Sequence, residues 1–272
     1  MIGEEDVFID DIKLQDIGII VKLDSQEPLL PSTRDQFVTI PGRHGAYDYG
    51  AWLQPRTFEL ACMFKRKNYT DLKQKIRKFI NLLLDYRGRP KDLKLRFGDE
   101  PQKYYTVRYS GAISLDRLVG MPSFILPLTA YNPHAYTITS NDEVTWGSKE
   151  ITFLNTAYTF GHTGGGKTKN ITSPQNYPVY VSGLVVRPVI TITGTGTNVT
   201  LSTNSKACSL GTFTNTNWII DLEEYTVIRN GVNGLRDFNG DFLEFMPGQN
   251  QISIGGSNLN FTIQVKFEDK FM

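Results

Sequence analysis

The stretch Asn258-Leu259-Asn260-Phe261-Thr262-Ile263-Gln264-Val265-Lys266-Phe267 decides the fold class, because polar and apolar residues alternate along it without a break. A period of two sends one set of side chains into a core and the other into solvent, as in a half-buried β-strand. Short apolar or β-branched runs without helical period precede it, and we expect each to form a strand. They are residues 150–154, 179–181, 189–192, 198–201, 218–222 and 225–228. Strands at this spacing predict a β-sandwich for the second half of the chain.

Three Asn-Gly pairs lie among these runs, and such pairs favour tight hairpin turns. They are Asn230-Gly231, Asn233-Gly234 and Asn239-Gly240. Asparagine and glycine adopt positive φ more readily than other residues, and two-residue hairpin turns require it. We therefore expect a positive φ at each pair.

The first half also contains strand-like runs, among them residues 37–40, but it differs from the second half by one clear helical period. Five apolar residues form one stripe at i, i+4, i+7, i+8 and i+11, namely Leu72, Ile76, Phe79, Ile80 and Leu83. Thr70 is the predicted N-cap, and Gly88 and Pro90 end the helix. The expected fold class is mainly β, with one α-helix packed on the sheet of the first domain.

The helix face opposite this stripe is basic. Lys73, Lys75, Arg77 and Lys78 lie there, and the basic character continues through residues 65–67 and 87–96. A solvated helix face explains such a cluster, and so does an electrostatic patch that meets an acidic neighbour or DNA. Both interpretations stay open from the sequence.

Composition excludes several classes of function. The chain has 272 residues, with 29 Lys and Arg against 28 Asp and Glu, so its net charge of +1 gives no global field for tight nucleic-acid binding. Cys62 and Cys208 have neither zinc nor redox spacing and are expected to be free thiols. The acidic residues 1–6 and the lack of a long apolar run indicate synthesis in a cytosol without membrane insertion.

The composition of the sequence changes near residues 132–140, because Thr, Asn, Gly and Ser dominate beyond that point. Length alone favours about two domains. We place the boundary so that residues 1–138 form the first domain and residues 139–272 form the second.

Residues Gly161–Thr168 satisfy the P-loop pattern G-x-x-x-x-G-K-[ST] literally. A P-loop needs a following helix whose amino terminus faces the phosphates. Pro174, Pro178 and the β-branched residues between them and the motif prevent such a helix. We interpret the motif as a glycine loop between strands and keep nucleotide hydrolysis only as a minor alternative.

No other catalytic pattern appears in the sequence. His44, His134 and His162 are the only histidines, and none has metal-ligand spacing or a nucleophile signature beside it. We therefore expect no catalytic residue, no cofactor and no metal.

Several motifs in order resemble the amino-terminal domain of siphophage distal tail proteins. The most specific is Ile40-Pro41-Gly42-Arg43-His44-Gly45, and Tyr131-Asn132-Pro133-His134-Ala135-Tyr136 follows it. Near the end of the chain, Met246-Pro247-Gly248-Gln249-Asn250 is similar to the closing segment of the same family, where a Pro-Gly-x-Asn turn precedes the final strands.

The resemblance implies a structural hub and not an enzyme. It implies a sandwich- or barrel-like first domain that joins into a homohexameric ring, and a galectin-like second domain. Partners would be the tail tube protein, a tail-associated tip protein and a receptor-binding protein, at the distal end of the virion tail, with DNA passing through without specific binding. The candidate interface consists of Pro41, Gly42, Arg43, Arg77 and Lys78.

The main alternative is a carbohydrate-binding module or adhesin on the virion surface. Trp146, Trp218 and the many tyrosines of the second half could stack against sugar rings if they were exposed. Scattered aromatic residues are more often part of a core.

Overall fold

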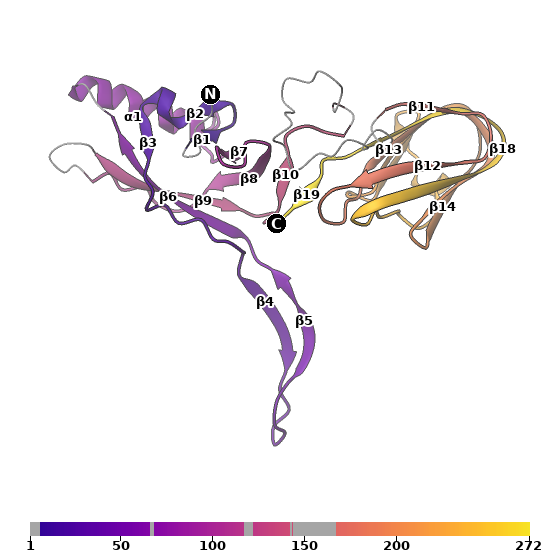
Figure 1. Cartoon of the computed structure of the whole chain (residues 1–272), viewed down its shortest axis with the longest axis horizontal. Helices are drawn as coiled ribbons and strands as arrows, with labels where there is room; N and C mark the ends of the chain where they lie inside the picture. The colour runs from indigo at the N-terminus through magenta and orange to yellow at the C-terminus, as the bar shows by residue number, and fades with distance from the viewer. Residues whose placement is uncertain (1–5, 66–67, 117–121, 142, 144–166) are drawn as a thin grey trace. The chain divides into compact units, whose positions relative to one another are not determined.

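A computed structural model describes residues 6–65, 68–116, 122–141, 143 and 167–272. By contact, the chain divides into two compact units, Met1–Ala135 with Met272 and Tyr136–Phe271. Within the described residues the fold is mainly β with a single α-helix, so the predicted fold class is confirmed (Figure 1).

The first unit is built on one antiparallel sheet with strand order β2-β1-β7-β8-β9-β6-β3. Its strands are β1 (Val7–Ile9), β2 (Ile12–Lys13), β3 (Ile19–Val21), β6 (Arg56–Phe64), β7 (Asp92–Phe97), β8 (Lys103–Tyr109) and β9 (Ser123–Ala130), with a 3-10 helix, η1 (Leu14–Ile17). Along β6, Phe58, Leu60 and Phe64 are buried, while Glu59 between them is exposed. This alternation gives the sheet one core face and one outer face.

The helix α1 (Tyr69–Leu83) covers the core face of this sheet. The Phe79 ring lies 6.1 Å from that of Phe64 and 5.3 Å from that of Phe124, centroid to centroid. Two details of the prediction were wrong. Asn68 is the N-cap instead of Thr70, because its side chain accepts a hydrogen bond of 2.8 Å from the Asp71 amide. Ile80 lies at the edge of the apolar stripe and is 45% exposed.

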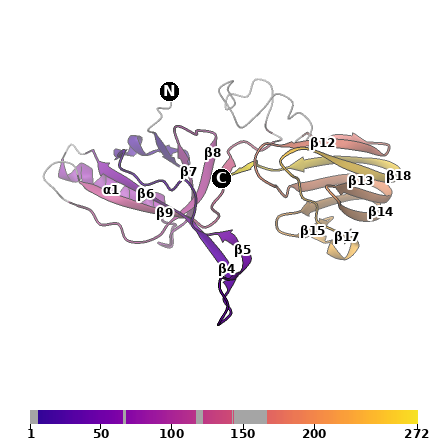
Figure 2. The same ribbon diagram turned by 60° about the horizontal axis from the view of Figure 1, so that its bottom comes forward.

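Two strands of the first unit, β4 (Thr33–Val38) and β5 (Tyr47–Leu53), pair only with each other. They form a hairpin that projects away from the seven strands listed above (Figures 1 and 2). The sequence predicted a strand at residues 37–40. The observed strand β4 starts earlier, ends at Val38 and lies outside the core.

The second unit is one long, curled antiparallel sheet with strand order β11-β18-β13-β14-β15-β16, to which β12 adds on β18 and β17 on β14. Its elements are β10 (Ala135–Thr137, which begins at the unit boundary), β11 (Lys169–Ile171), β12 (Gln175–Val181), β13 (Val189–Thr203), β14 (Lys206–Asp221), β15 (Thr226–Arg229), β16 (Val232–Asn233), η2 (Leu235–Asp237), β17 (Asn239–Gly240), β18 (Gly248–Lys266) and β19 (Lys270–Phe271). The alternating residues 258–267 fall mostly in β18, where Leu259, Phe261, Ile263 and Val265 enter one buried cluster.

The long strands bend because their pairing shifts register near Gly194. This glycine has a φ of 144°, and a Cβ there would lie 2.4 Å from the Asn260 carbonyl oxygen. Only glycine allows the two backbones to approach so closely. The bend lets one sheet wrap around a single core.

The Asn-Gly prediction was confirmed in full at Asn230-Gly231, where the φ values are 49° and 81° and the pair connects β15 to β16. At Asn239-Gly240 the prediction was confirmed for the φ of Gly240, which is 112°, but not for a hairpin turn, because these residues form strand β17 and pair with β14. It was wrong at Asn233-Gly234, because Gly234 has a φ of −105° and precedes the 3-10 helix η2.

The first and last segments of the second unit run side by side. The Thr137 amide donates to the Asp269 carbonyl oxygen at 3.0 Å, and the Asp269 amide donates to the Thr137 hydroxyl at 3.0 Å. The Asn141 amide donates to the Phe267 carbonyl oxygen at 3.1 Å. Thr137 and Asp269 are both buried. The chain therefore enters and leaves this unit through a hydrogen-bonded pair of segments.

Candidate functional site

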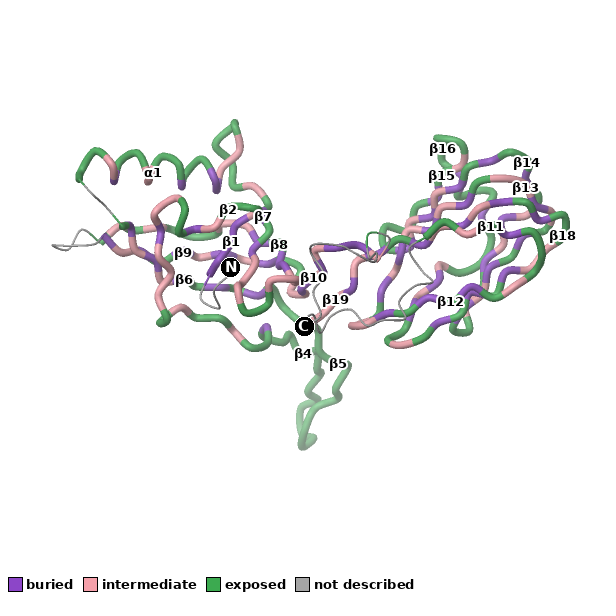
Figure 3. The backbone as a smooth tube through the Cα atoms, turned by 45° about the horizontal axis from the view of Figure 1, so that its top comes forward, coloured by how far each residue is buried: buried purple, intermediate pink, exposed green. Residues whose placement is uncertain are grey.

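The hairpin β4–β5 is the most unusual surface of the first unit, because every residue of both strands is exposed (Figure 3). Phe37, Tyr49 and Trp52 are 63%, 65% and 59% exposed. A two-stranded hairpin alone is marginally stable in water, and large exposed apolar residues mark surfaces that another molecule covers. The hairpin also leaves the outer backbone edge of each strand unpaired within the described residues. It is therefore a candidate assembly surface.

Three of the predicted interface residues lie at the tip of this hairpin. The Arg43 amide donates to the Ile40 carbonyl oxygen at 3.1 Å, and Gly42 has a φ of 81°. Proline at the second position and a positive-φ glycine at the third define a type II turn, which explains the spacing of Pro41 and Gly42. The Arg43 guanidinium lies 4.7 Å from the Tyr47 ring centroid and donates to the Tyr47 hydroxyl.

The root of the hairpin is fixed by Arg56, which sequence analysis missed. Its buried guanidinium donates to the Tyr105 hydroxyl at 2.9 Å and to the Pro28 carbonyl oxygen at 2.6 Å. Burial raises the pKa of Tyr105, and the nearby Arg56 charge opposes that shift. Arg56 thus joins the segment before β4 to the central sheet. An arginine at the start of a strand gives no signal of this role in the sequence.

Arg77 and Lys78, the other two predicted interface residues, lie on the exposed side of α1. The structure does not bring them together with Pro41, Gly42 and Arg43, because α1 packs on the sheet while the hairpin projects away from it (Figure 1). The five residues therefore belong to two separate surfaces.

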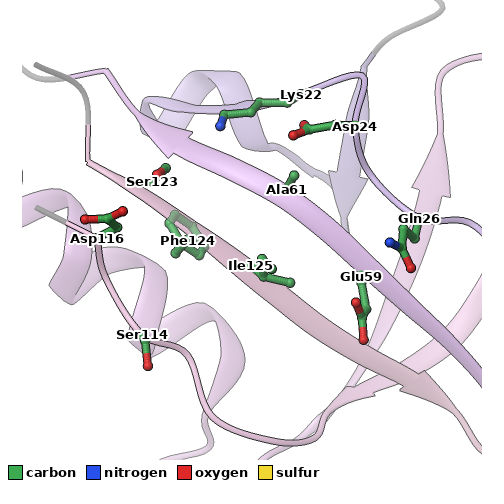
Figure 4. A pocket seen from close by; sticks show the side chains of 10 residues that line it. All are labelled: Lys22, Asp24, Gln26, Glu59, Ala61, Ser114, Asp116, Ser123, Phe124 and Ile125. Carbon is green, nitrogen blue, oxygen red and sulfur yellow. The ribbon is translucent and has the colours of Figure 1, made fainter. Parts of the chain in front are cut away.

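A hollow of about 390 Å³ lies beside β3, β6 and β9 (Figure 4). Three carboxylate side chains line it, from Asp24, Glu59 and Asp116, together with Lys22 and Ile125. Among the residues that the structure describes, no group of three or more His, Cys, Asp or Glu has a metal-binding arrangement. Within the same residues, no helix is long and apolar enough to cross a membrane.

The remaining sequence candidates offer little chemistry. Residues 161–166 of the P-loop pattern lie outside the described residues, and the chain continues after Thr168 into strand β11 instead of a helix. Both cysteines are buried, and burial raises the pKa of each thiol to about 12.

The carbohydrate-binding alternative requires exposed aromatic rings that can stack on sugars. Trp218 is fully buried and cannot serve in this way. Trp146, the other tryptophan of that alternative, lies outside the described residues.

Residues 12–130 match the family described as the phage tail protein RIFT-related domain. The fold of the whole chain is similar to that of one solved phage protein. The crystal structure of the SPP1 Dit (gp 19.1) protein, described as a paradigm of the hub adsorption apparatus in phages infecting Gram-positive bacteria, is similar over 98% of this chain and 99% of that chain. The TM-score is 0.69 at 18% identity. The predicted resemblance is thereby confirmed.

Two structures of the phage p2 baseplate in its activated conformation, with Sr and with Ca, also cover 98% of this chain and 99% of theirs. Their TM-scores are 0.47 and 0.46, at 12% and 11% identity. No curated protein matches the sequence.

Proposed function

We infer that the chain is a structural component of the distal tail of a long-tailed bacteriophage. Six copies form a ring that joins the tail tube protein to a tip protein and to the receptor-binding apparatus. The role needs no catalytic residue and no cofactor. The SPP1 Dit fold and the phage tail domain at residues 12–130 support this assignment.

The observation that carries the proposal is the hairpin β4–β5. Its exposed Phe37 and Trp52 and its unpaired strand edges leave it without a partner among the described parts of its own chain. A neighbouring copy that packs against it buries the aromatic side chains and extends the pairing. Head-to-tail contacts between identical copies end in a closed ring when the rotation closes, and the ring leaves no free hairpin.

Charge supports a conduit for DNA. The net charge of +1 gives the ring no strong field that would hold a passing duplex by counterion release. Weak contact with the phosphates allows fast transit.

Native mass spectrometry and negative-stain microscopy of the purified full chain test the proposal. We expect a closed hexamer for the unchanged chain and mostly monomer for Phe37→Ser with Trp52→Ser. Tyr86→Ser is the matched control, because it also removes an exposed aromatic ring but lies outside the hairpin, and it should leave the hexamer intact. Hexamers of unchanged abundance for the hairpin variant, or a wild-type chain that stays monomeric at every concentration, would contradict the proposal.

A further inference from the structure

The outer side of α1 carries positive charge that no carboxylate of the described residues pairs with. Lys73, Arg77 and Lys78 are exposed there, and among the described residues none of them forms an ion pair with a carboxylate. Ile80 follows one turn beyond Arg77, at the edge of the apolar stripe that borders these basic residues, and is half exposed. We call these four residues the basic helix face.

The hollow beside β3, β6 and β9 has the opposite character. Asp24, Glu59 and Asp116 point their carboxylates toward it, against the single cation of Lys22 (Figure 4). Among the described residues no ion pair involves any of these four side chains. Ile125, which is 55% exposed, supplies an apolar patch at its centre. We call this surface the acidic hollow.

The two surfaces lie on opposite sides of the same sheet. The helix packs against the core face through the ring contacts of Phe79 with Phe64 and Phe124. Glu59 and Ile125 alternate with buried residues of β6 and β9, so their side chains point to the other face. A single copy therefore cannot bring its own basic helix face to its own acidic hollow.

We propose that the basic helix face of one copy docks on the acidic hollow of a second copy of this chain, in addition to the hairpin contact. The inference rests on the proposed ring. Surfaces of opposite charge on opposite sides of one layer suit a head-to-tail contact, in which each copy presents a different face to each neighbour. Complementary charge also fixes the register of neighbours and speeds their encounter.

Apolar contact contributes to the same interface. Ile80 lies at the border of the basic helix face, where it also lines an apolar hollow with Phe79. Ile125 lies in the acidic hollow, so docking can remove the exposed part of both isoleucine side chains from water. Because the charges are exposed, the contact weakens as salt rises and the screening length shortens.

Charge reversal with rescue tests the contact on the full chain. Arg77→Glu with Lys78→Glu should weaken association about tenfold, which is the effect of losing a small set of ion pairs. Glu59→Lys with Asp116→Lys should weaken it to a similar extent. The combination of all four changes restores the original net charge and the complementarity, and association should recover. Arg236→Glu, which alters an exposed charge in the second unit, should leave association unchanged.

Sedimentation velocity at low salt measures association, and circular dichroism checks that every variant is folded. Recovery in the fourfold variant supports the contact. If either double reversal assembles like wild type, or if the fourfold variant is as weak as its parents, the contact is wrong. The hairpin variant Phe37→Ser with Trp52→Ser separates the two proposals. If the hairpin variant fails to assemble while the charge variants assemble normally, the contact between the basic helix face and the acidic hollow is wrong and the ring proposal is supported.

Discussion

The Arg56 guanidinium donates a hydrogen bond of 2.9 Å to the Tyr105 hydroxyl and holds the root of the exposed hairpin against the central sheet. The same guanidinium also reaches the Pro28 carbonyl oxygen, which lies before the hairpin in the sequence. One buried side chain therefore ties the segments before and after the hairpin to the central sheet.

Replacing Arg56 should destabilise the protein. Arg56→Ala leaves the Tyr105 hydroxyl and the Pro28 carbonyl oxygen without their donor, so we expect a loss of about 2 kcal/mol in the free energy of unfolding. Urea unfolding followed by fluorescence measures it. Arg34→Ala, in the exposed strand β4, is the matched control and should change stability by less than about 0.5 kcal/mol. Equal stability of Arg56→Ala and wild type would remove Arg56 from this role.

The Glu244 carboxylate should make the second unit sensitive to acid. It accepts hydrogen bonds from Arg187 and pairs with Lys206 at 2.9 Å, and these partners lower its pKa below the ordinary value of 4.5. A lowered folded-state pKa means that its stabilising contribution is complete above pH 4.5 and is lost as pH falls through the folded-state value.

Glu244→Gln tests this pH dependence. We expect the variant to be about 1 kcal/mol less stable than wild type at pH 7, and the difference should shrink as the pH falls below 4.5. Urea unfolding at several pH values gives the curve. A difference that grows toward acid would contradict the sign of the pKa shift.

Asn250 explains why the closing Pro-Gly-x-Asn pattern needs asparagine. Its Nδ2 donates to the Met246 carbonyl oxygen at 2.7 Å and to that of Gly248 at 3.1 Å, while its Oδ1 accepts from the Met246 amide at 2.9 Å. Because the side chain is buried, Asn250→Ala should cost about 1–3 kcal/mol. Gln249→Ala, at the exposed neighbour, is the control for thermal unfolding. A matching Tm for both variants would show that the turn does not depend on Asn250.

The bend at Gly194 should not tolerate a side chain. Gly194→Ala places a Cβ 2.4 Å from the Asn260 carbonyl oxygen and imposes strain at a φ of 144°, so we expect a loss of at least about 2 kcal/mol in the free energy of unfolding. The exposed neighbour Thr193 provides the control as Thr193→Ala. A Gly194→Ala protein as stable as this control would mean that the strands can separate at the bend without cost.

Both cysteines should be inert in the folded protein. At pH 8, a thiol with a pKa of about 12 is only about one ten-thousandth thiolate, and burial also blocks the reagent. Labelling with a disulfide reagent should therefore proceed only after unfolding, when Cys62 and Cys208 both react. Rapid labelling of the native protein would contradict the burial of one of them.

Sequence periodicity was sufficient to predict the helix and the strands that pack on a core, because burial of one face imposes a repeat of apolar residues. Residues 258–267 and the stripe from Leu72 to Leu83 are examples. The sequence could not show that the hairpin is exposed. β-branched and aromatic residues favour strands whether they pack against their own chain or against another chain.

The candidate site was predictable only in part. The family resemblance singled out Pro41 and Gly42, which the structure places at the hairpin tip, where proline and a positive-φ glycine suit a type II turn. The role of Arg56 depends on hydrogen-bond partners 28 and 49 residues away in the sequence. No local sequence pattern indicates such contacts. The same holds for the acidic hollow, whose carboxylates come from separate strands and loops.

The paired segments at Thr137 and Asp269 bear on how such a protein changes over evolution. A module whose two ends already touch can be removed or exchanged as a cassette, because the host scaffold then needs to close only a short gap. Recombination at these two points would therefore exchange the second unit while residues 12–130 keep their own core.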